Sequence, residues 1–138
     1  MQRSRRTDVF FYGLFMDQDL LRAKGLAPQN AELAAVPGFE LRIGQRAALV
    51  PRVSSRVHGV IVSLTLAVLE RLYSEPSVQA YEPQAVLVHL ASGGVVAAVC
   101  YNLSEPPSPS EHNPEYAIRL RAIGKKVGLP IEYLDSLQ

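Results

Sequence analysis

The chain has 138 residues, 48% of them apolar, and a formal net charge of +1. This length suits one domain with a single core, and the apolar content excludes a disordered chain. The near-neutral charge creates no field that strongly attracts nucleic acid. No apolar run approaches the roughly 20 residues that span a bilayer, and a single cysteine excludes an internal disulfide. We therefore expect one domain over residues 1–138, located in the cytoplasm, with neither nucleic acid nor a membrane as partner. The sequence leaves the oligomeric state open.

The N-terminal segment begins with three arginines, Arg3, Arg5 and Arg6. They predict a solvated, frayed tail over residues 1–7, with a basic contact site as the alternative interpretation. The apolar stretch behind them ends at Gly13, so it is too short for the core of a secretory signal.

A strand over residues 8–12 runs into Gly13, and a helix follows at once. Asp17 is placed to cap that helix and Gly25 to end it. A strand that breaks at glycine before a helix lets backbone N–H groups converge, which is a common way to bind an anion. Tight packing of the strand on the helix explains the same pattern.

The middle of the chain predicts strands. Residues 26–36 fit no single element, Pro37-Gly38 predicts a turn, and alternation predicts a strand over residues 39–43. Two further strands are expected at residues 47–50, ended by Pro51, and at the β-branched run 57–64. Gly59 inside that run predicts a bulge or a close approach of two backbones.

The second half predicts helices over residues 66–73, 114–127 and 130–137, with Thr65, Asn113 and Gly128 as flanking caps and stops. A Ser92-Gly93-Gly94 hairpin joins strands 84–90 and 95–102, and the segments 74–81 and 104–113 predict loops. Mostly antiparallel strands with few crossovers indicate an α+β fold.

Several short motifs agree in their order with those of one known family. Tyr12-Gly13-Leu14 followed by a helix is similar to the family's Tyr-Gly-Ser/Thr-Leu opening, and residues 57–64 match its Val-x-Gly-x-x-x-x-Leu strand. The segments at residues 37–41, 48–51, 113–116 and 128–134 also agree. On this ordered set the chain resembles the gamma-glutamylcyclotransferase-like family, also called AIG2-like.

The resemblance implies a small mixed β-barrel with flanking helices and a pocket at one mouth. It also implies a reaction in which the α-amino group of a γ-glutamyl amide attacks its own γ-carbonyl, giving 5-oxoproline and a released amine or amino acid. The expected partner is therefore a small-molecule γ-glutamyl compound. Because the attack is intramolecular, it requires a base and anion-binding groups, and we expect no metal or redox cofactor.

The resemblance also implies the site residues. Glu75, in the loop after the helix 66–73, stands where the family carries its catalytic glutamate, whereas Glu70 and Glu82 are expected to be exposed. The expected substrate-binding residues are Tyr12, Gly13, Leu14 and Phe15 in the turn, with Tyr81 and Tyr116 lining the pocket. For the last two, a place at the edge of the core is the alternative.

Two departures from the family pattern keep other functions open. Leu14 replaces the hydroxyl residue after Tyr-Gly, and Arg71 to Pro76 replaces Leu-Asp-x-x-Glu-Gly before and around the glutamate. The alternatives are a catalytically silent small-molecule-binding protein on the same scaffold and an enzyme acting on another amide with the same carboxylate. Cys100 is expected to be a buried structural thiol. The three histidines, His58, His89 and His112, lack metal-ligand spacing.

Overall fold

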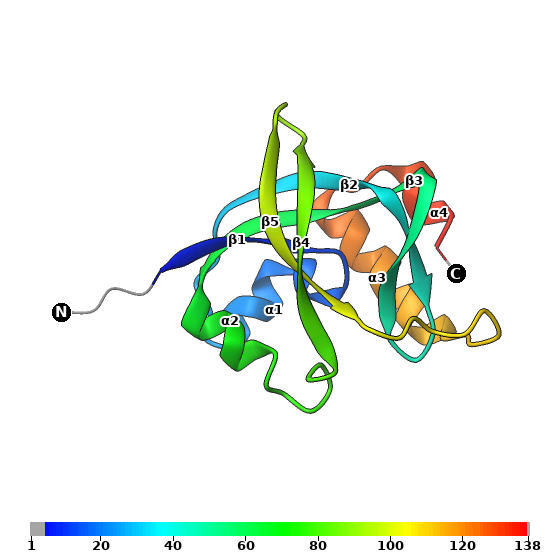
Figure 1. Cartoon of the computed structure of the whole chain (residues 1–138), viewed down its shortest axis with the longest axis horizontal. Coiled ribbons are helices and arrows are strands. Elements are labelled where there is room, and N and C mark those ends of the chain that lie inside the picture. The colour runs from blue at the N-terminus through cyan, green and yellow to red at the C-terminus, as the bar shows by residue number, and fades with distance from the viewer. Residues whose placement is uncertain (1–4, 138) are drawn as a thin grey trace.

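Runs rich in valine, isoleucine and aromatic residues form five strands. The protein is described by a computed structural model over residues 5–137. Its strands are β1 (Arg6–Phe11), β2 (Gln29–Ile43), β3 (Ala47–Thr65), β4 (Tyr81–Leu90) and β5 (Val95–Leu103). They close into a barrel in the order β1-β3-β2-β4-β5 (Figure 1), and only the β1–β5 pair is parallel. The predicted α+β class, a small mixed barrel with flanking helices, is confirmed.

The helices begin and end close to the residues that the sequence indicated. They are the 3₁₀ turn η1 (Leu14–Met16), α1 (Gln18–Ala23), α2 (Leu66–Leu72), α3 (Pro114–Val127) and α4 (Ile131–Asp135). Side-chain oxygens of Asp17, Thr65 and Asn113 accept backbone N–H bonds at the starts of α1, α2 and α3. Gly128, with φ of +96°, ends α3. The last helix is shorter than the predicted 130–137.

The predicted turn at Pro37-Gly38 is wrong. β2 continues through it, and Pro37 pairs with Arg56 while Phe39 pairs with Pro51. The β3 residues between these two partners are therefore left out of the register, and Gly38 takes a φ of +87° at the irregularity. Two long paired strands thus replace several short ones, because the cross-strand pairing on both sides of Pro37-Gly38 outweighs the local turn preference of this dipeptide.

The predicted tail over residues 1–7 is wrong at Arg6 and Thr7, which are the first residues of β1. The Arg6 guanidinium donates to the Ser63 hydroxyl at 2.9 Å and to the Ser63 carbonyl at 2.7 Å. Cross-strand pairing and these bonds order residues that composition alone marked as solvated. The prediction for residues 1–4 lies outside the described residues.

At Gly59, β3 leaves no space for a side chain beside the end of β1. A Cβ atom at this position would overlap the carbonyl oxygen of Phe11 and would lie 2.9 Å from Cζ of Phe10. The β2–β3 register runs without a break past Gly59. The close approach that the sequence predicted as one of two options is confirmed, and there is no bulge at this residue. Gly59 therefore leaves room for the end of β1 to pair beside β3, just before the chain turns at Gly13.

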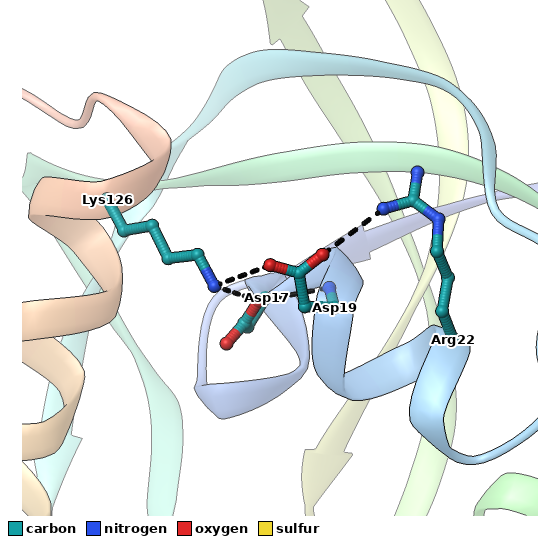
Figure 2. Close-up of polar contacts among 4 residues, drawn as sticks. All are labelled: Asp17, Asp19, Arg22 and Lys126. Carbon is teal, nitrogen blue, oxygen red and sulfur yellow. Dashed lines mark hydrogen bonds and ion pairs between the residues drawn. The ribbon is translucent and has the colours of Figure 1, made fainter.

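Ion pairs fasten the long C-terminal helix α3 to the N-terminal helix α1. Lys126 Nζ lies 3.0 Å from Asp17 Oδ1 and 2.8 Å from Asp19 Oδ2, and Asp19 also faces Arg22 at 3.5 Å (Figure 2). The hydrogen bond and charge of Lys126 hold the pKa of the Asp19 carboxyl below its ordinary value. Asp17 thus both caps α1 and binds α3, so the two helices are held in register beside the 3₁₀ turn.

Candidate functional site

A cavity of about 380 Å³ opens between the turn at residues 12–15 and the loop that follows α2. Five of the six tyrosines in the chain line it: Tyr12, Tyr73, Tyr81, Tyr101 and Tyr116. Its size falls in the range of pockets that take small organic ligands. Its wall combines apolar rings with phenol groups, so it offers both apolar contact and polar atoms.

The turn at residues 12–15 forms one wall of this cavity. Gly13 has a φ of −117°, so glycine is not needed there for a left-handed backbone. It is needed for space, because a Cβ atom would lie 2.8 Å from the Tyr116 hydroxyl. Burial raises the pKa of Tyr116 to about 12, while a hydrogen bond from the Leu14 backbone and the Arg119 charge act in the opposite direction. The Tyr116 side chain of α3 therefore places its phenol against the turn.

Two of the predicted binding tyrosines also hold the barrel together. The buried Tyr12 hydroxyl donates to the Tyr101 carbonyl at 2.8 Å, and the Tyr81 hydroxyl donates to the Ala47 carbonyl at 2.5 Å. Burial raises the pKa of both phenols well above the usual range. Both side chains line the cavity, but their hydroxyls are already used by backbone acceptors.

Aromatic rings pack in sequence along one side of the cavity. Tyr73 stacks on Tyr101 with ring centroids 3.8 Å apart, and it meets Phe15 and Tyr81 edge-on at 5.9 and 6.2 Å. Phe15 in turn packs edge-on against Phe11. The apolar Phe15 of the unusual Leu14-Phe15 pair thus joins the aromatic wall.

Glu75 is one of the residues that line the cavity. It follows α2 by a short loop and lines the same cavity as Gly13 and Phe15. Both of its carboxylate oxygens accept hydrogen bonds from Lys24 Nζ, at 3.0 and 3.1 Å. The side chains of Lys24 and Glu75 are 32% and 38% exposed, so solvent reaches the pair. Glu70 and Glu82 are exposed and do not line the cavity.

The structure brings every predicted site residue to one cavity, and the further lining residues include five charged or tyrosine side chains that the sequence did not single out. These are Lys24, Arg46, Tyr73, Tyr101 and Arg119. Tyr73 and Tyr101 belong to no motif. Only the number of tyrosines in the sequence hinted that they could line a site. The three basic residues come from a helix end, a loop and a helix, and only the closed barrel brings them together.

A second hollow, of about 370 Å³, lies on the α1 and α3 side and contains the ion pairs of Figure 2. Its charged groups include Asp17, Asp19, Arg22 and Lys126, which bind one another. Because these groups satisfy each other, the hollow offers few free polar partners to a ligand. The tyrosine-lined cavity is therefore the better candidate.

The other features considered from the sequence, a reactive cysteine, a metal site and a membrane span, do not contribute to the cavity. Cys100 is fully buried, and burial raises the pKa of its thiol to about 12, so it is a structural residue. Within residues 5–137, no group of three His, Cys, Asp or Glu side chains is arranged to hold a metal ion. Over the same residues, no helix has the length and apolar character needed to cross a bilayer.

Fold and cavity together define a class of protein: a closed five-stranded mixed barrel in which the first strand turns into a helix at a tyrosine-lined cavity. A family model described as "Gamma-glutamyl cyclotransferase, AIG2-like" matches residues 9–119. The chain belongs to this family, as its motifs indicated.

Solved structures show the same fold at low sequence identity. A gamma-glutamyl cyclotransferase has 20% identity and a TM-score of 0.80, with 97% of this chain and 89% of that chain covered. An uncharacterized protein from Homo sapiens has 22% identity and a TM-score of 0.78, with 96% and 88% covered. A protein from Arabidopsis thaliana has 22% identity and a TM-score of 0.68, with 91% and 87% covered. No curated protein matches the chain.

Proposed function

We propose that this protein cyclises a γ-glutamyl amide to 5-oxoproline and releases an amine or amino acid, with Glu75 as the general acid and base. The observation that carries the proposal is the position of the Glu75 carboxylate in the same cavity as the turn at residues 12–15. Family membership supports the reaction class. The partner is a small-molecule γ-glutamyl compound.

The reaction needs little beyond a base and anion-binding groups. In the proposed sequence, Glu75 accepts a proton from the substrate α-ammonium, and the freed amine attacks the γ-carbonyl carbon. The amide C–N bond then breaks, and the protons lost by the attacking nitrogen pass to the leaving nitrogen. Attack within one molecule supplies proximity, so the protein has to hold a folded substrate conformation in a cavity of this size.

The turn is suited to the negative charges of the substrate. The first N–H groups of a helical turn have no partner within that turn, and the turn at residues 12–15 leads directly into η1. These N–H groups, of which that of Leu14 is bonded to Tyr116 in the free protein, are the proposed donors for the α-carboxylate or the developing oxyanion. Tyr116 lies against Gly13, so its hydroxyl is placed beside the same group.

The first prediction tests Glu75 as the base. Glu75→Gln keeps the shape of the side chain but cannot accept the proton, so the rate of 5-oxoproline release should fall by about 10²–10⁴-fold. The measurement is 5-oxoproline formation from a panel of γ-glutamyl amides.

Glu70→Gln and Glu82→Gln are the matched controls, because both residues are exposed and lie outside the cavity. They should retain the wild-type rate. Wild-type turnover by Glu75→Gln would exclude Glu75 as the base.

One observation favours a second candidate, a binding protein without turnover. Both oxygens of Glu75 are engaged by Lys24, so the carboxylate of the free protein already has a cation as partner. If no amide is cyclised while a γ-glutamyl compound binds in the cavity, this second function is correct.

A further inference from the structure

Arg119 is a cationic residue of the cavity wall and lies near the turn at residues 12–15. It follows Tyr116 by three residues on α3, and residues at this spacing share one face of a helix. Both residues line the cavity, and the Tyr116 hydroxyl lies against Gly13. Burial raises the pKa of the Tyr116 phenol, and the Arg119 charge acts in the opposite direction, as expected of a neighbouring cation. The guanidinium group is therefore on the side of the cavity that the turn forms.

The helix that carries Arg119 is fixed to the rest of the molecule at both ends. At its start, Asn113 caps the helix and donates from Nδ2 to the Gln45 carbonyl at 3.3 Å. Near its end, Lys126 binds Asp17, the residue that follows η1, at 3.0 Å (Figure 2). A side chain carried on a helix held in this way starts from a defined position, which suits a binding role.

No carboxylate among residues 5–137 forms an ion pair with Arg119. Glu115, one turn earlier on α3, does not line the cavity. Glu75 is the one carboxylate among the described residues that line it, and Lys24 already binds Glu75 at 3.0 Å. The Arg119 guanidinium is therefore available to an anion that enters the cavity.

The turn itself has few donors left for a second anionic group. The Leu14 N–H is bonded to the Tyr116 phenol. The N–H groups of Met16 and Asp17 bond back to carbonyls of the turn at 3.1 and 3.2 Å. In the transition state of the proposed reaction, the glutamyl end carries both an α-carboxylate and a developing oxyanion. Without another partner, these two groups would have to share the remaining N–H groups of a short turn.

We propose that Arg119 binds the α-carboxylate of the γ-glutamyl group, so that the N–H groups of the turn serve the developing oxyanion. This inference rests on the proposed function. The carboxylate carries a full charge on two oxygens, and a guanidinium group can donate to both at once. The oxyanion is a single oxygen that gains its charge only in the transition state, which suits fixed backbone N–H groups. Glu75 remains the partner of the α-ammonium.

The test compares two ligands that differ only at the α-carboxyl position. 5-Oxoproline, the expected product, carries the carboxylate, and 5-oxoprolinamide has a neutral carboxamide in its place. Calorimetry on the wild type should show about five- to tenfold tighter binding of the acid, a modest range because Arg119 is exposed. Arg119→Gln should remove this preference. Arg119→Lys should retain part of it, because an ammonium group keeps the charge without the planar pair of N–H groups.

Lys125→Gln is the matched control. Lys125 is an exposed cation of the same helix that does not line the cavity, so this variant changes the net charge equally. It should keep the wild-type preference for the acid. Equal binding of 5-oxoproline and its amide by the wild type, or a preference that survives Arg119→Gln, overturns the inference.

Turnover distinguishes a failure of this inference from a failure of the proposed reaction. With γ-glutamylglycine as substrate, Arg119→Gln should raise KM by about five- to tenfold and change kcat less, because the α-carboxylate is bound equally in the substrate and in the transition state. An unchanged KM with normal turnover overturns the inference and leaves the reaction standing. A preference for 5-oxoproline over its amide that Arg119→Gln removes, in a protein that cyclises no γ-glutamyl amide, supports the inference, and only the proposed reaction then fails.

Discussion

At the scale of single residues, the contact between Lys24 and Glu75 is the feature with the most direct consequence for the proposed reaction. One ammonium group binds both carboxylate oxygens of the free protein. A substrate whose α-ammonium must reach Glu75 has to share or displace this partner. Because about a third of each side chain is exposed, the cost of displacement is that of a surface ion pair, about 0.2–1 kcal/mol.

This competition gives the second prediction. Lys24→Met should lower KM for γ-glutamyl amides by about two- to fivefold, because the substrate no longer competes with an internal ammonium, and kcat should change less. Lys24→Arg, which keeps a cation at the carboxylate, should retain the wild-type KM. The measurement is steady-state 5-oxoproline formation.

Lys126→Met is the control for this prediction. It removes the same kind of side chain from an exposed ion pair that lies outside the tyrosine-lined cavity. Its KM should match the wild type. A rise of KM in Lys24→Met would mean that Lys24 binds the substrate directly.

Some residues of the candidate site could be predicted from the sequence, and others could not. Glu75 and Gly13 belong to motifs with a fixed order along the chain, so a resemblance was enough to single them out. Arg46 and Arg119 belong to no such motif, and an exposed arginine looks the same in sequence whether or not a cavity lies beside it. Their shared position depends on the closure of the barrel, which local sequence does not encode.

At the scale of elements, the pairing of β1 with β3 decides where the turn at residues 12–15 lies. Phe11 pairs with Val60, the residue that follows Gly59. The missing side chain at Gly59 makes room for the Phe11 carbonyl and the Phe10 ring. The end of β1, and therefore the start of the turn, depends on this one gap.

The third prediction concerns that gap. Gly59→Ala should lower the free energy of unfolding by about 2–4 kcal/mol, because the methyl group would overlap a backbone oxygen that has no room to move. Urea denaturation followed by circular dichroism measures the loss. Ser54→Ala, at an exposed position of the same strand, should change stability by less than about 0.5 kcal/mol. Equal stability of the two variants would contradict the packing argument.

Elements were predictable where their signals are local. Helix caps at Asp17, Thr65 and Asn113 depend on a side chain and an N–H group a few residues away, and all three were found. The Pro37-Gly38 dipeptide carries an equally local turn signal, yet it lies inside β2. Pairing with β3 on either side of the dipeptide keeps it inside the strand, and that partner cannot be read from the dipeptide itself.

At the scale of the whole molecule, the buried phenols link stability to alkaline pH. Burial raises the pKa of Tyr12, Tyr73 and Tyr81 above their ordinary value, and it raises that of Tyr116 to about 12. In the unfolded chain these groups ionise near pH 10. The unfolded state therefore loses protons before the folded state does, and the stability that these phenols contribute is lost as the pH rises.

The fourth prediction follows from this direction of the pH dependence of stability. The free energy of unfolding should be unaffected by the phenols below about pH 9 and should fall steadily above about pH 10, as the unfolded state gains stability by ionisation. Urea denaturation at a series of alkaline pH values measures the fall. Tyrosinate absorbance should then rise in the same transition as the loss of circular dichroism. A rise of tyrosinate absorbance in a fully folded protein, large enough to include the cavity tyrosines, would contradict this account.

The order along the chain of the segments that line the cavity has a consequence for protein synthesis. The apolar end of β1 and its turn leave the ribosome before Tyr116 and Arg119, which line the same cavity, have been added. At about 5–20 residues per second, the first strand waits for several seconds before β5 can pair with it and α3 can cover the turn. Until then β3 can pair with one side of β1, and the other side of the strand remains an exposed edge on the nascent chain. The cavity is thus one of the last parts of the molecule to form, although its first wall is among the earliest to be made.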